Sequence, residues 1–179
     1  MGSEVLLWVL PAIGGWIWAT VIEYVIHRWI FHGVGKKRSS IFSFHWHAHH
    51  KDSRKGKMLE RCYIEREWAW NGYTREVAAM VFLATIHIPV LFLSPAFTFG
   101  VWAWCLAYHW VHRKTHVDPQ WARDHCSWHY DHHMAPNQDA NYGVTSDWMD
   151  RLMGTRERYA GTEKERKMLE RRKTADAAS

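Results

Sequence analysis

Histidine is the residue type most able to carry chemistry in this chain, because 13 of its 14 copies in 179 residues are gathered into clusters. The clusters are HRWIFH at 27–32, HWHAHH at 45–50, HWVHRKTH at 109–116 and HCSWHYDHH at 125–133. A single histidine is usually structural or exposed, as we expect for the isolated His87. Thirteen grouped imidazoles, packed as a neutral core, would leave many polar atoms without hydrogen bonds. The clusters therefore predict metal binding.

The spacing within the clusters indicates which histidines converge. Residues three or four apart share one face of a helix. Such spacings occur in His45 and His49, in His112 and His116, and in His129, His132 and His133. His27 and His32 are instead five apart, a spacing that suits the end of a helix.

The number of histidines favours two metal ions over one. Imidazole binds iron, zinc, copper and nickel. Structural zinc needs four ligands and catalytic zinc about three, so about ten histidines exceed the needs of one ion. The clusters contain no glutamate, which argues against the Glu-x-x-His di-iron sites of soluble bundles. Haem would use two axial histidines and leave the rest unexplained, so a dinuclear iron centre is the best match.

Two long apolar segments predict membrane helices beside the clusters. Residues 5–22 contain no Asp, Glu, Lys or Arg, and with the next four residues they reach the length of about 20 that crosses a bilayer. A signal peptide fits poorly, because no positive charge precedes this segment. Residues 77–112 also lack these charges, and Pro89 and Pro95 interrupt them. This pattern predicts a hairpin of two short membrane helices, with a re-entrant hairpin buried in protein as the alternative.

The basic residues lie in two segments that the membrane helices would leave on one side. Residues 33–67 hold nine Lys/Arg against four Asp/Glu, and residues 151–179 hold nine against five. The positive-inside rule places that side in the cytoplasm. Membrane orientation thus explains the net charge of +5, and the absence of any nucleic-acid motif excludes nucleic acid as an expected partner.

The predicted fold is an all-α integral membrane helical bundle with a cytoplasmic histidine-rich helical cap. We expect a helix around residues 56–76, one domain over residues 1–160, and a charged, helical or flexible tail over residues 161–179. The three scattered cysteines do not form a disulfide framework. With few apolar helices to close a bundle, association into a homo-oligomer is an open alternative.

The chain resembles the fatty acid hydroxylase/sterol desaturase superfamily of integral membrane di-iron enzymes. The order of its four histidine clusters carries the resemblance over residues 20–155. EYVIHRWIFH at 23–32 is similar to the first histidine box of that family. NYGVTS at 141–146, followed by WMDRLMGT at 148–155, resembles its C-terminal signature. HHKDSRKG at 49–56 is similar to carotenoid hydroxylases, a branch of the superfamily.

The resemblance implies a set of metal ligands. These are His27, His32, His49, His50, His112, His116, His129, His132 and His133, together with a further histidine of the second cluster. The family's H-x2-H-H box would need histidine at position 46, where this chain has Trp46. His45 or His47 serves instead, and helical spacing favours His45.

Carboxylates near the clusters are candidates for orienting the ligands. A metal-bound histidine usually donates its other N–H to a carboxylate or a carbonyl. Glu23 precedes His27 by one turn and is a candidate for orienting it, with a surface or salt-bridged role as the alternative. Asp131 and Asp124 are further candidates, with a surface or salt-bridged role as the alternative. Two other histidines rank below the main ligand set, His109 and His125.

The resemblance implies a membrane-bound oxygenase over residues 1–160. Two iron ions would use O2 and external electrons to hydroxylate an unactivated C–H bond of a lipid, namely a fatty acyl chain, a sterol or a carotenoid. A separate electron donor of the ferredoxin or cytochrome b5 type is expected. Zinc is an expected substitute for iron in recombinant material, because imidazole sites accept both.

Three other readings remain open. A lipid desaturase would use the same di-iron site. A histidine-rich metal transport or storage protein would be non-enzymatic, although transporters place their ionisable residues inside the membrane segments. A b-type cytochrome would show a haem absorption band.

Overall fold

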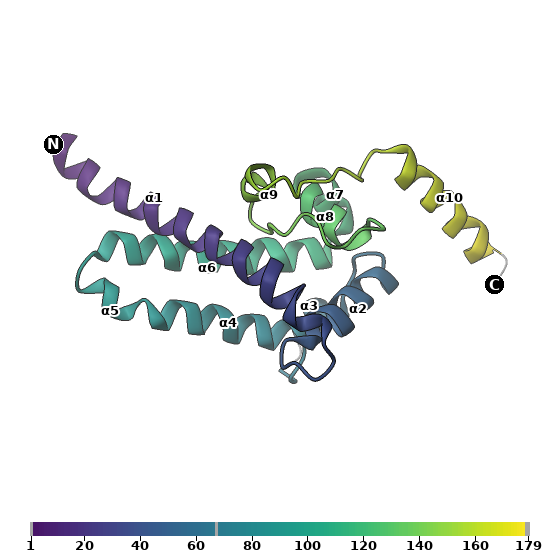
Figure 1. Ribbon diagram of the computed structural model, residues 1–179, viewed down its shortest axis with the longest axis horizontal. Helices are drawn as coiled ribbons and strands as arrows, with labels where there is room; N and C mark the ends of the chain where they lie inside the picture. Colours follow the sequence, from purple (N-terminus) through teal and green to yellow (C-terminus); the bar gives the residue numbers. More distant parts are fainter. Residues whose placement is uncertain (1, 67, 178–179) are drawn as a thin grey trace.

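Three long helices run side by side and carry a cap of shorter helices at one end (Figure 1). The computed structural model describes residues 2–66 and 68–177, and these residues form helices and no strand. The long helices are α1 (Gly2–Val25), α4 (Gly72–Ile86) and α6 (Pro95–Val117). The all-helical prediction is confirmed for the described residues.

Helix α1 packs closely against α6 because both helices carry glycine where they meet. A Cβ atom at Gly15 would lie 2.0 Å from the carbonyl oxygen of Phe97, and one at Gly100 would lie 2.0 Å from that of Ala12. Small residues of this kind let the backbones of membrane helices approach. The α1–α6 pair is therefore the most closely packed part of the long half of the molecule.

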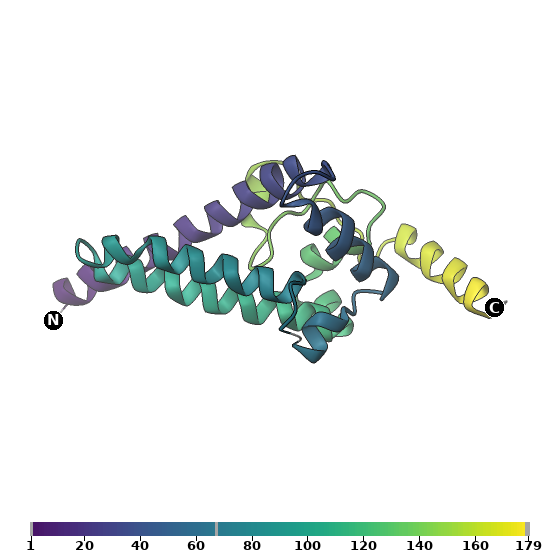
Figure 2. The same cartoon turned by 90° about the horizontal axis from the view of Figure 1, so that it is seen from below.

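The predicted hairpin is present. Helix α4 ends at Ile86, the short α5 (Ile88–Leu91) forms the bend, and α6 returns beside α4 (Figure 2). Pro89 and Pro95 occupy the first turns of α5 and α6, where a missing backbone N–H costs nothing. The prolines thus end one helix and begin the next, as the sequence predicted.

One helical stretch among the described residues, Val5–Lys36, is long and apolar enough to cross a bilayer. The large apolar side chains of α1 between Val5 and Ile13 are exposed, and so are Phe82, Leu93 and Leu106 of the hairpin. An exposed apolar surface of this extent marks an interaction face. The arms of the hairpin do not reach the same threshold for a membrane span.

The predicted helix over residues 56–76 is wrong. The chain instead forms α3 (Arg61–Glu65), which ends at Arg66 in the left-handed conformation with φ of 52°. A new helix then begins at Asn71, whose side chain accepts a hydrogen bond from the backbone N–H of Thr74. The left-handed residue Arg66 and the N-cap Asn71 therefore divide the predicted helix into two helices.

Two histidine clusters lie on π-helical turns that follow directly from regular helices or precede them. The turn η1 (Ile26–Phe31) continues α1, and a 3-10 turn, η2 (Val34–Lys36), follows it. The turn η3 (His45–His49) leads into α2 (His50–Lys55). These elements bring the first half of the chain into the cap.

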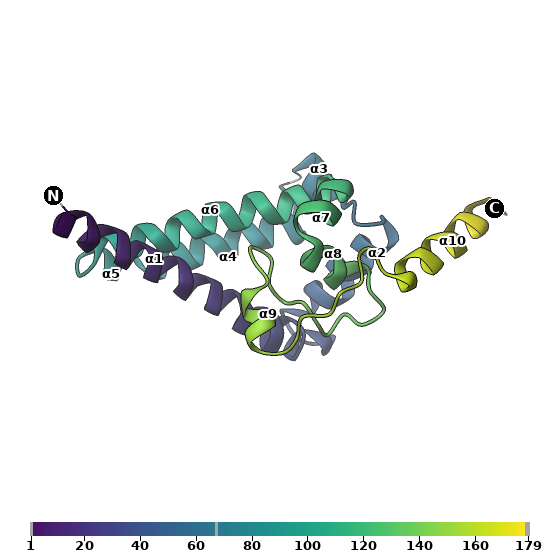
Figure 3. The same ribbon diagram turned by 90° about the horizontal axis from the view of Figure 1, so that it is seen from above.

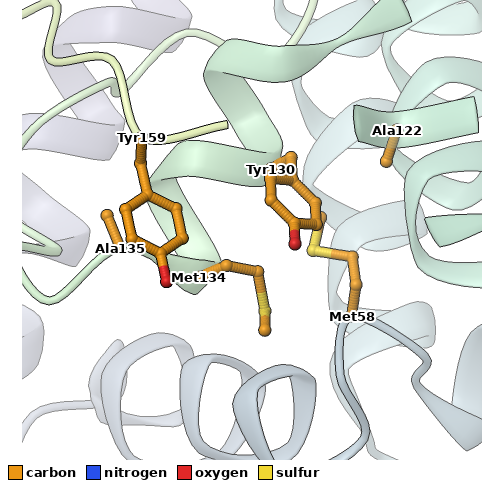
Figure 4. Packing of buried hydrophobic residues seen from close by; sticks show 6 residues of the cluster. All are labelled: Met58, Ala122, Tyr130, Met134, Ala135 and Tyr159. Carbon is orange, nitrogen blue, oxygen red and sulfur yellow. The ribbon is translucent and has the colours of Figure 1, made fainter. Parts of the chain in front are cut away.

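The second half of the cap consists of α7 (Pro119–His125), α8 (Ser127–Met134) and α9 (Trp148–Leu152). Figure 4 shows its apolar core, in which side chains from the loop after α2, from α7 and α8, and from the segment after α9 meet. The core residues are Met58, Ala122, Tyr130, Met134, Ala135 and Tyr159. This packing joins the two halves of the cap.

The tail forms α10 (Glu163–Ala177), which points away from the cap (Figure 3). Its first turn is attached by an ion pair, in which Nη2 of Arg123 lies 2.9 Å from Oε2 of Glu165. The structure thus places residues 163–177 of the tail in a helix.

Candidate metal centre

Nine buried histidines form two groups, and within each group one ligand atom from every residue lies within 4.8 Å of the others. The first group is His27, His32, His45, His50 and His132. The second group is His49, His112, His116 and His133. Both lie in the cap, where α1 and α6 end.

The π-helical turns explain the five-residue spacings of the first group. In η1 the backbone N–H of His32 donates to the carbonyl of His27 at 3.0 Å, and in η3 the N–H of His50 donates to the carbonyl of His45. Hydrogen bonds from i to i+5 bring residues five apart onto one side of the turn. His45 and His49 converge as expected only as a contact between neighbouring groups, since their ring centroids are 5.2 Å apart but the two residues enter different groups.

Two pairs of adjacent histidines are shared between the groups. His49 belongs to the second group and His50 to the first, while His132 belongs to the first and His133 to the second. Each half of the chain therefore supplies most of one group and a single histidine to the other. The expected convergence of His132 with His133 holds only as a contact between neighbouring groups, with ring centroids 5.1 Å apart.

His129 lies against the second group. It is fully buried, and its Nε2 lies 3.3 Å from Nε2 of His116. Its ring centroid is 4.9 Å from that of His112 and 4.6 Å from that of His133. Ten buried histidines thus occupy one continuous region of the cap.

Oxygen atoms accept hydrogen bonds from the Nδ1 atoms of three histidines of the first group, on the side of each ring away from the other histidines. Nδ1 of His27 donates to the carbonyl of Tyr142 at 2.5 Å, and Nδ1 of His132 donates to the carbonyl of Ala140 at 2.7 Å. A carbonyl can only accept, so Nδ1 carries the proton in both rings and Nε2 presents a lone pair. Asp139 lies 3.3 Å from Nδ1 of His32 in a similar position.

Glu60 holds one histidine of the second group. Its Oε2 accepts from Nδ1 of His49 at 2.7 Å and from the hydroxyl of Ser53 at 2.9 Å. Burial alone would raise the pKa of Glu60, but the adjacent His49 lowers it to about 2. Burial opposes the charged form of His49, yet Glu60 raises the pKa of that ring. A buried carboxylate therefore holds the Nδ1 side of the His49 ring and leaves Nε2 on the opposite side.

Glu76 is a second buried carboxylate behind the same group. It accepts from Nδ1 of His112, from Nδ1 of His109 at 2.7 Å, and from the hydroxyl of Tyr63 at 2.8 Å. His109 is thereby tied to the carboxylate that orients His112 and is not a member of either group. Nδ1 of His116 donates to a carbonyl, that of Met58, at 3.1 Å.

The donor set fits metal ions. In the first group Nε2 of His50 lies 3.1–3.2 Å from the Nε2 atoms of His32, His45 and His132, although a neutral ring has one proton to share. Burial, followed by the neighbouring imidazoles, holds the pKa of His45 and His50 well below its usual value. These rings are therefore neutral, which is the form that binds a metal.

Further nitrogen atoms in this region have no hydrogen-bond partner within residues 2–66 and 68–177. They are Nε2 of His49, Nδ1 of His50, Nδ1 of His129 and both ring nitrogens of His133. Buried polar atoms without partners are uncommon, and a bound ion is one of their ordinary explanations.

His47 and His125 also lie outside both groups. Nε2 of His47 donates to the carbonyl of Lys36 at 3.0 Å, and the residue is partly exposed. Of the two alternatives for the second cluster, the structure brings His45 into the first group. His125 stacks on Trp121 near the surface, with an interplanar angle of 11°.

His87 has the structural role expected of an isolated histidine. Its Nδ1 donates to the carbonyl of Leu83 at 2.8 Å, and its Nε2 accepts from the indole N–H of Trp18 at 3.1 Å. Both ring nitrogens are satisfied, and they tie the bend of the hairpin to α1.

Glu23 does not take the role of a direct partner of His27. Its carboxylate accepts from the backbone N–H groups of Val144 and Thr145 and from the Thr145 hydroxyl at 2.9 Å. Glu23 therefore holds the loop that carries the Tyr142 carbonyl, and acts on His27 only through that loop.

The two aspartates take the alternative structural role. Asp131 accepts from Arg156 at 2.8 Å and from the backbone N–H of Ala160 at 2.6 Å. Asp124 is exposed and accepts from Gln120 at 2.7 Å.

The carboxylates that orient ligands are instead Glu60 and Glu76, which the sequence reasoning missed. One feature of the sequence marked Glu76 as a candidate: it is the last charged residue before the apolar segment 77–112.

Comparison with known families agrees with the geometry of the cap. The family model described as fatty acid hydroxylase matches residues 12–155. The chain belongs to the fatty acid hydroxylase family. The match includes every histidine of both groups, with Glu60 and Glu76, and stops before α10. Neither the comparison with curated proteins nor that with solved structures finds a match.

Membership of the fatty acid hydroxylase family gives the cap a chemical context. Its members are typically oxidoreductases that act on lipids, and the family suggests the use of iron. The buried histidine groups of this chain could hold metal ions. The exposed apolar α1 agrees with membrane association of the fatty acid hydroxylase family.

Proposed function

We propose that the protein is a membrane-bound, O2-dependent di-iron hydroxylase of a lipid C–H bond. The observation that carries the proposal is the arrangement of nine buried histidines in two adjoining groups within a chain of the fatty acid hydroxylase family. One iron would be held by the first group. The other would be held by the second group with His129.

Two bound irons would supply the redox chemistry that couples O2 and external electrons to oxygen insertion. The carbonyls of Tyr142 and Ala140 fix the tautomers of His27 and His132, so that each ring offers Nε2 as a ligand. Glu60 and Glu76 accept the outer protons of His49 and His112 and increase their strength as ligands. The protein's own residues thus orient the ligands and exclude water from them.

The lipid substrate is proposed to enter from the bilayer along the apolar helices. The exposed apolar side chains of α1 and of the hairpin would face the acyl chains, and the cap would face the cytoplasm with its basic segments. A separate ferredoxin or cytochrome b5 type donor would deliver electrons to the cap.

The test combines metal analysis with isotope labelling. Protein grown with added iron is purified in detergent, and its metal content and visible spectrum are measured. It is then incubated with a reducing system, 18O2 and pools of fatty acids, sterols and carotenoids. About two irons per chain, no haem band and a product that carries one 18O atom support the hydroxylase.

Two variants give this test a matched control. H132A removes a histidine of the first group, while H47A removes a neighbouring histidine outside both groups. We expect H132A to lose iron and product, and H47A to keep both. A product that has lost two hydrogens without gaining 18O would identify a desaturase. Bound zinc or copper that iron does not replace would contradict the proposal.

A further inference from the structure

A cavity of about 660 Å3 opens beside the second histidine group. His49 and Glu60 form part of its wall, so the cavity reaches the histidine region directly. Phe44, Leu59 and Trp70 give it apolar walls, and Arg75 from the first turn of α4 places a cation among them. The cavity therefore combines an apolar lining with a positive charge.

Two aromatic rings hold Arg75 in place. Its guanidinium carbon lies 4.5 Å from the ring centroid of Phe44 and 5.0 Å from that of Trp70. Its Nε is buried and has no hydrogen-bond partner among the described residues. Stacking on aromatic faces orients a guanidinium without using its N–H donors. Arg75 is thus prepared to bind an anionic oxygen.

The acidic groups of the cavity wall, Asp52 and Glu60, form no ion pair with Arg75 in the described part of the chain. Glu60 is engaged by His49 and Ser53, and its other oxygen accepts from the thiol of Cys62 at 3.4 Å. No ion pair within 4.0 Å joins Arg75 to a carboxylate in residues 2–66 and 68–177. The exposed Lys55, also on the cavity wall, adds a second positive charge.

The surroundings of the cavity resemble a membrane interface. Trp68 and Trp70 are 81% and 72% exposed, and Ile64 nearby is 49% exposed. Tryptophan is enriched at the depth of lipid headgroups. These residues also stand at the start of α4, where the apolar hairpin begins. The cavity therefore opens where the polar end of an amphiphile would lie.

We propose that this cavity binds the anionic end of a single-chain amphipathic lipid, a carboxylate or a phosphate, through Arg75. The aromatic walls contact the first methylene groups of the chain. The proposal rests on the proposed function in one respect only, that the bound lipid is the molecule offered to the histidine groups. Binding itself needs neither iron nor turnover, so it is measured separately from activity.

The test measures quenching of tryptophan fluorescence by a brominated fatty acid in detergent-solubilised protein. The acid brominated near its carboxyl end is compared with its methyl ester, which has the same chain and no charge. We expect the acid to bind about tenfold tighter than the ester, as one charge-assisted contact predicts. A brominated single-chain phosphate lipid should behave as the acid does.

Variants locate the site. R75Q should reduce the preference for the acid to less than about twofold, while R38Q, which changes an exposed arginine outside the cavity, should keep it. W70F should lose the main part of the quenching, because Trp70 lines the cavity. This variant keeps the proposal testable if R75Q does not fold.

Any one of the following results would overturn the proposal. The first is an ester that binds wild type as tightly as the acid. The second is a preference for the acid that survives in R75Q, or quenching that is unchanged in W70F. The third is displacement of the acid by equimolar inorganic phosphate, which would assign the site to a free anion. Binding that behaves as expected in a protein without hydroxylase activity would retain this proposal and refute the function proposed above.

Discussion

The carboxylate of Glu60 lies 2.7 Å from Nδ1 of His49, while Nε2 of the same ring is buried and has no hydrogen-bond partner in the part of the chain that the structure describes. Glu76 stands behind His112 in the same manner. In the first group the corresponding acceptors are two backbone carbonyls and the exposed Asp139. The second group therefore has two buried negative charges behind it, and we expect it to hold a divalent ion more tightly than the first.

Replacing Glu60 tests this asymmetry. E60Q should weaken metal binding at one of two sites by about 10- to 100-fold, because His49 loses its anionic partner. The other site should be weakened less, because its own ligands and their hydrogen-bond partners are unchanged. A metal titration of metal-stripped protein, followed by calorimetry, measures both sites. E65Q, in the same segment but exposed, is the control, and an equal effect of the two variants would refute the role of Glu60.

Position 45, not 47, should be required for metal. H45A removes a buried imidazole that lies 3.0 Å from Nε2 of His27, whereas H47A removes a partly exposed ring bonded to the Lys36 carbonyl. We expect H45A to retain about one metal ion per chain or fewer, and H47A to retain the wild-type content. Mass spectrometric metal analysis of both purified variants decides the point, and the reverse pattern would assign the ligand to His47.

His87 should contribute to stability and not to metal content. H87A removes the hydrogen bonds to Trp18 and to the Leu83 carbonyl and leaves a small cavity at the bend of the hairpin. The expected cost is about 1–3 kcal/mol in the free energy of unfolding. Thermal denaturation in detergent and metal analysis of the same sample provide the two readouts. Loss of metal without loss of stability would contradict this assignment.

Metal binding by the first group should depend on the number of residues in η1 more than on the side chain of Ile30. Deleting Ile30 would leave His27 and His32 four residues apart and remove the i to i+5 geometry that brings both into the first group. I30A keeps the spacing and is the matched control. We expect the deletion to lose the ion of the first group and I30A to keep it, as metal content per chain will show. Equal metal content in both variants would refute the requirement for the turn.

The metal-stripped protein should lose stability in mild acid. Burial lowers the pKa of His132 to about 4, and the pKa values of His45 and His50 are also lowered. Below about pH 6.5 the unfolded chain binds protons that the folded chain does not, so stability falls as the pH drops from 6.5 towards 4. Each such histidine contributes up to about 1.4 kcal/mol per pH unit. Unfolding temperatures at pH 7, 6 and 5 measure the effect, and a constant value would show that the rings are not buried as neutral bases.

The hairpin and the grouping of histidines were predictable because their causes are local. Pro89 and Pro95 act on their own helices, and a cluster of imidazoles has few uses other than metal binding. The division of His45 and His49 between two groups was not predictable, because a spacing of four residues was interpreted on a regular helix, and nothing in the sequence marks a π-helical turn.

The partners of the ligands were harder to predict because they come from distant segments. Glu76 is 36 residues from His112 and meets it only after the hairpin has folded back. Glu23 lies one turn from His27, but the loop at Val144, 121 residues away, takes its carboxylate. One sequence cannot reveal which of several nearby acids a folded loop will use.

The shared histidine pairs have a consequence for how the two groups respond to each other. His49 and His50 are joined by a single peptide unit, as are His132 and His133, and consecutive Cα atoms are about 3.8 Å apart. Two covalent links of fixed length therefore bridge the groups, and neither group can shift without moving the other. Occupation of one by an ion should immobilise ligands of its neighbour, so that loading is cooperative and half-filled protein is rare. The spacing between the groups is set by the covalent chain, and swelling or loosening of the surrounding helices would change it little.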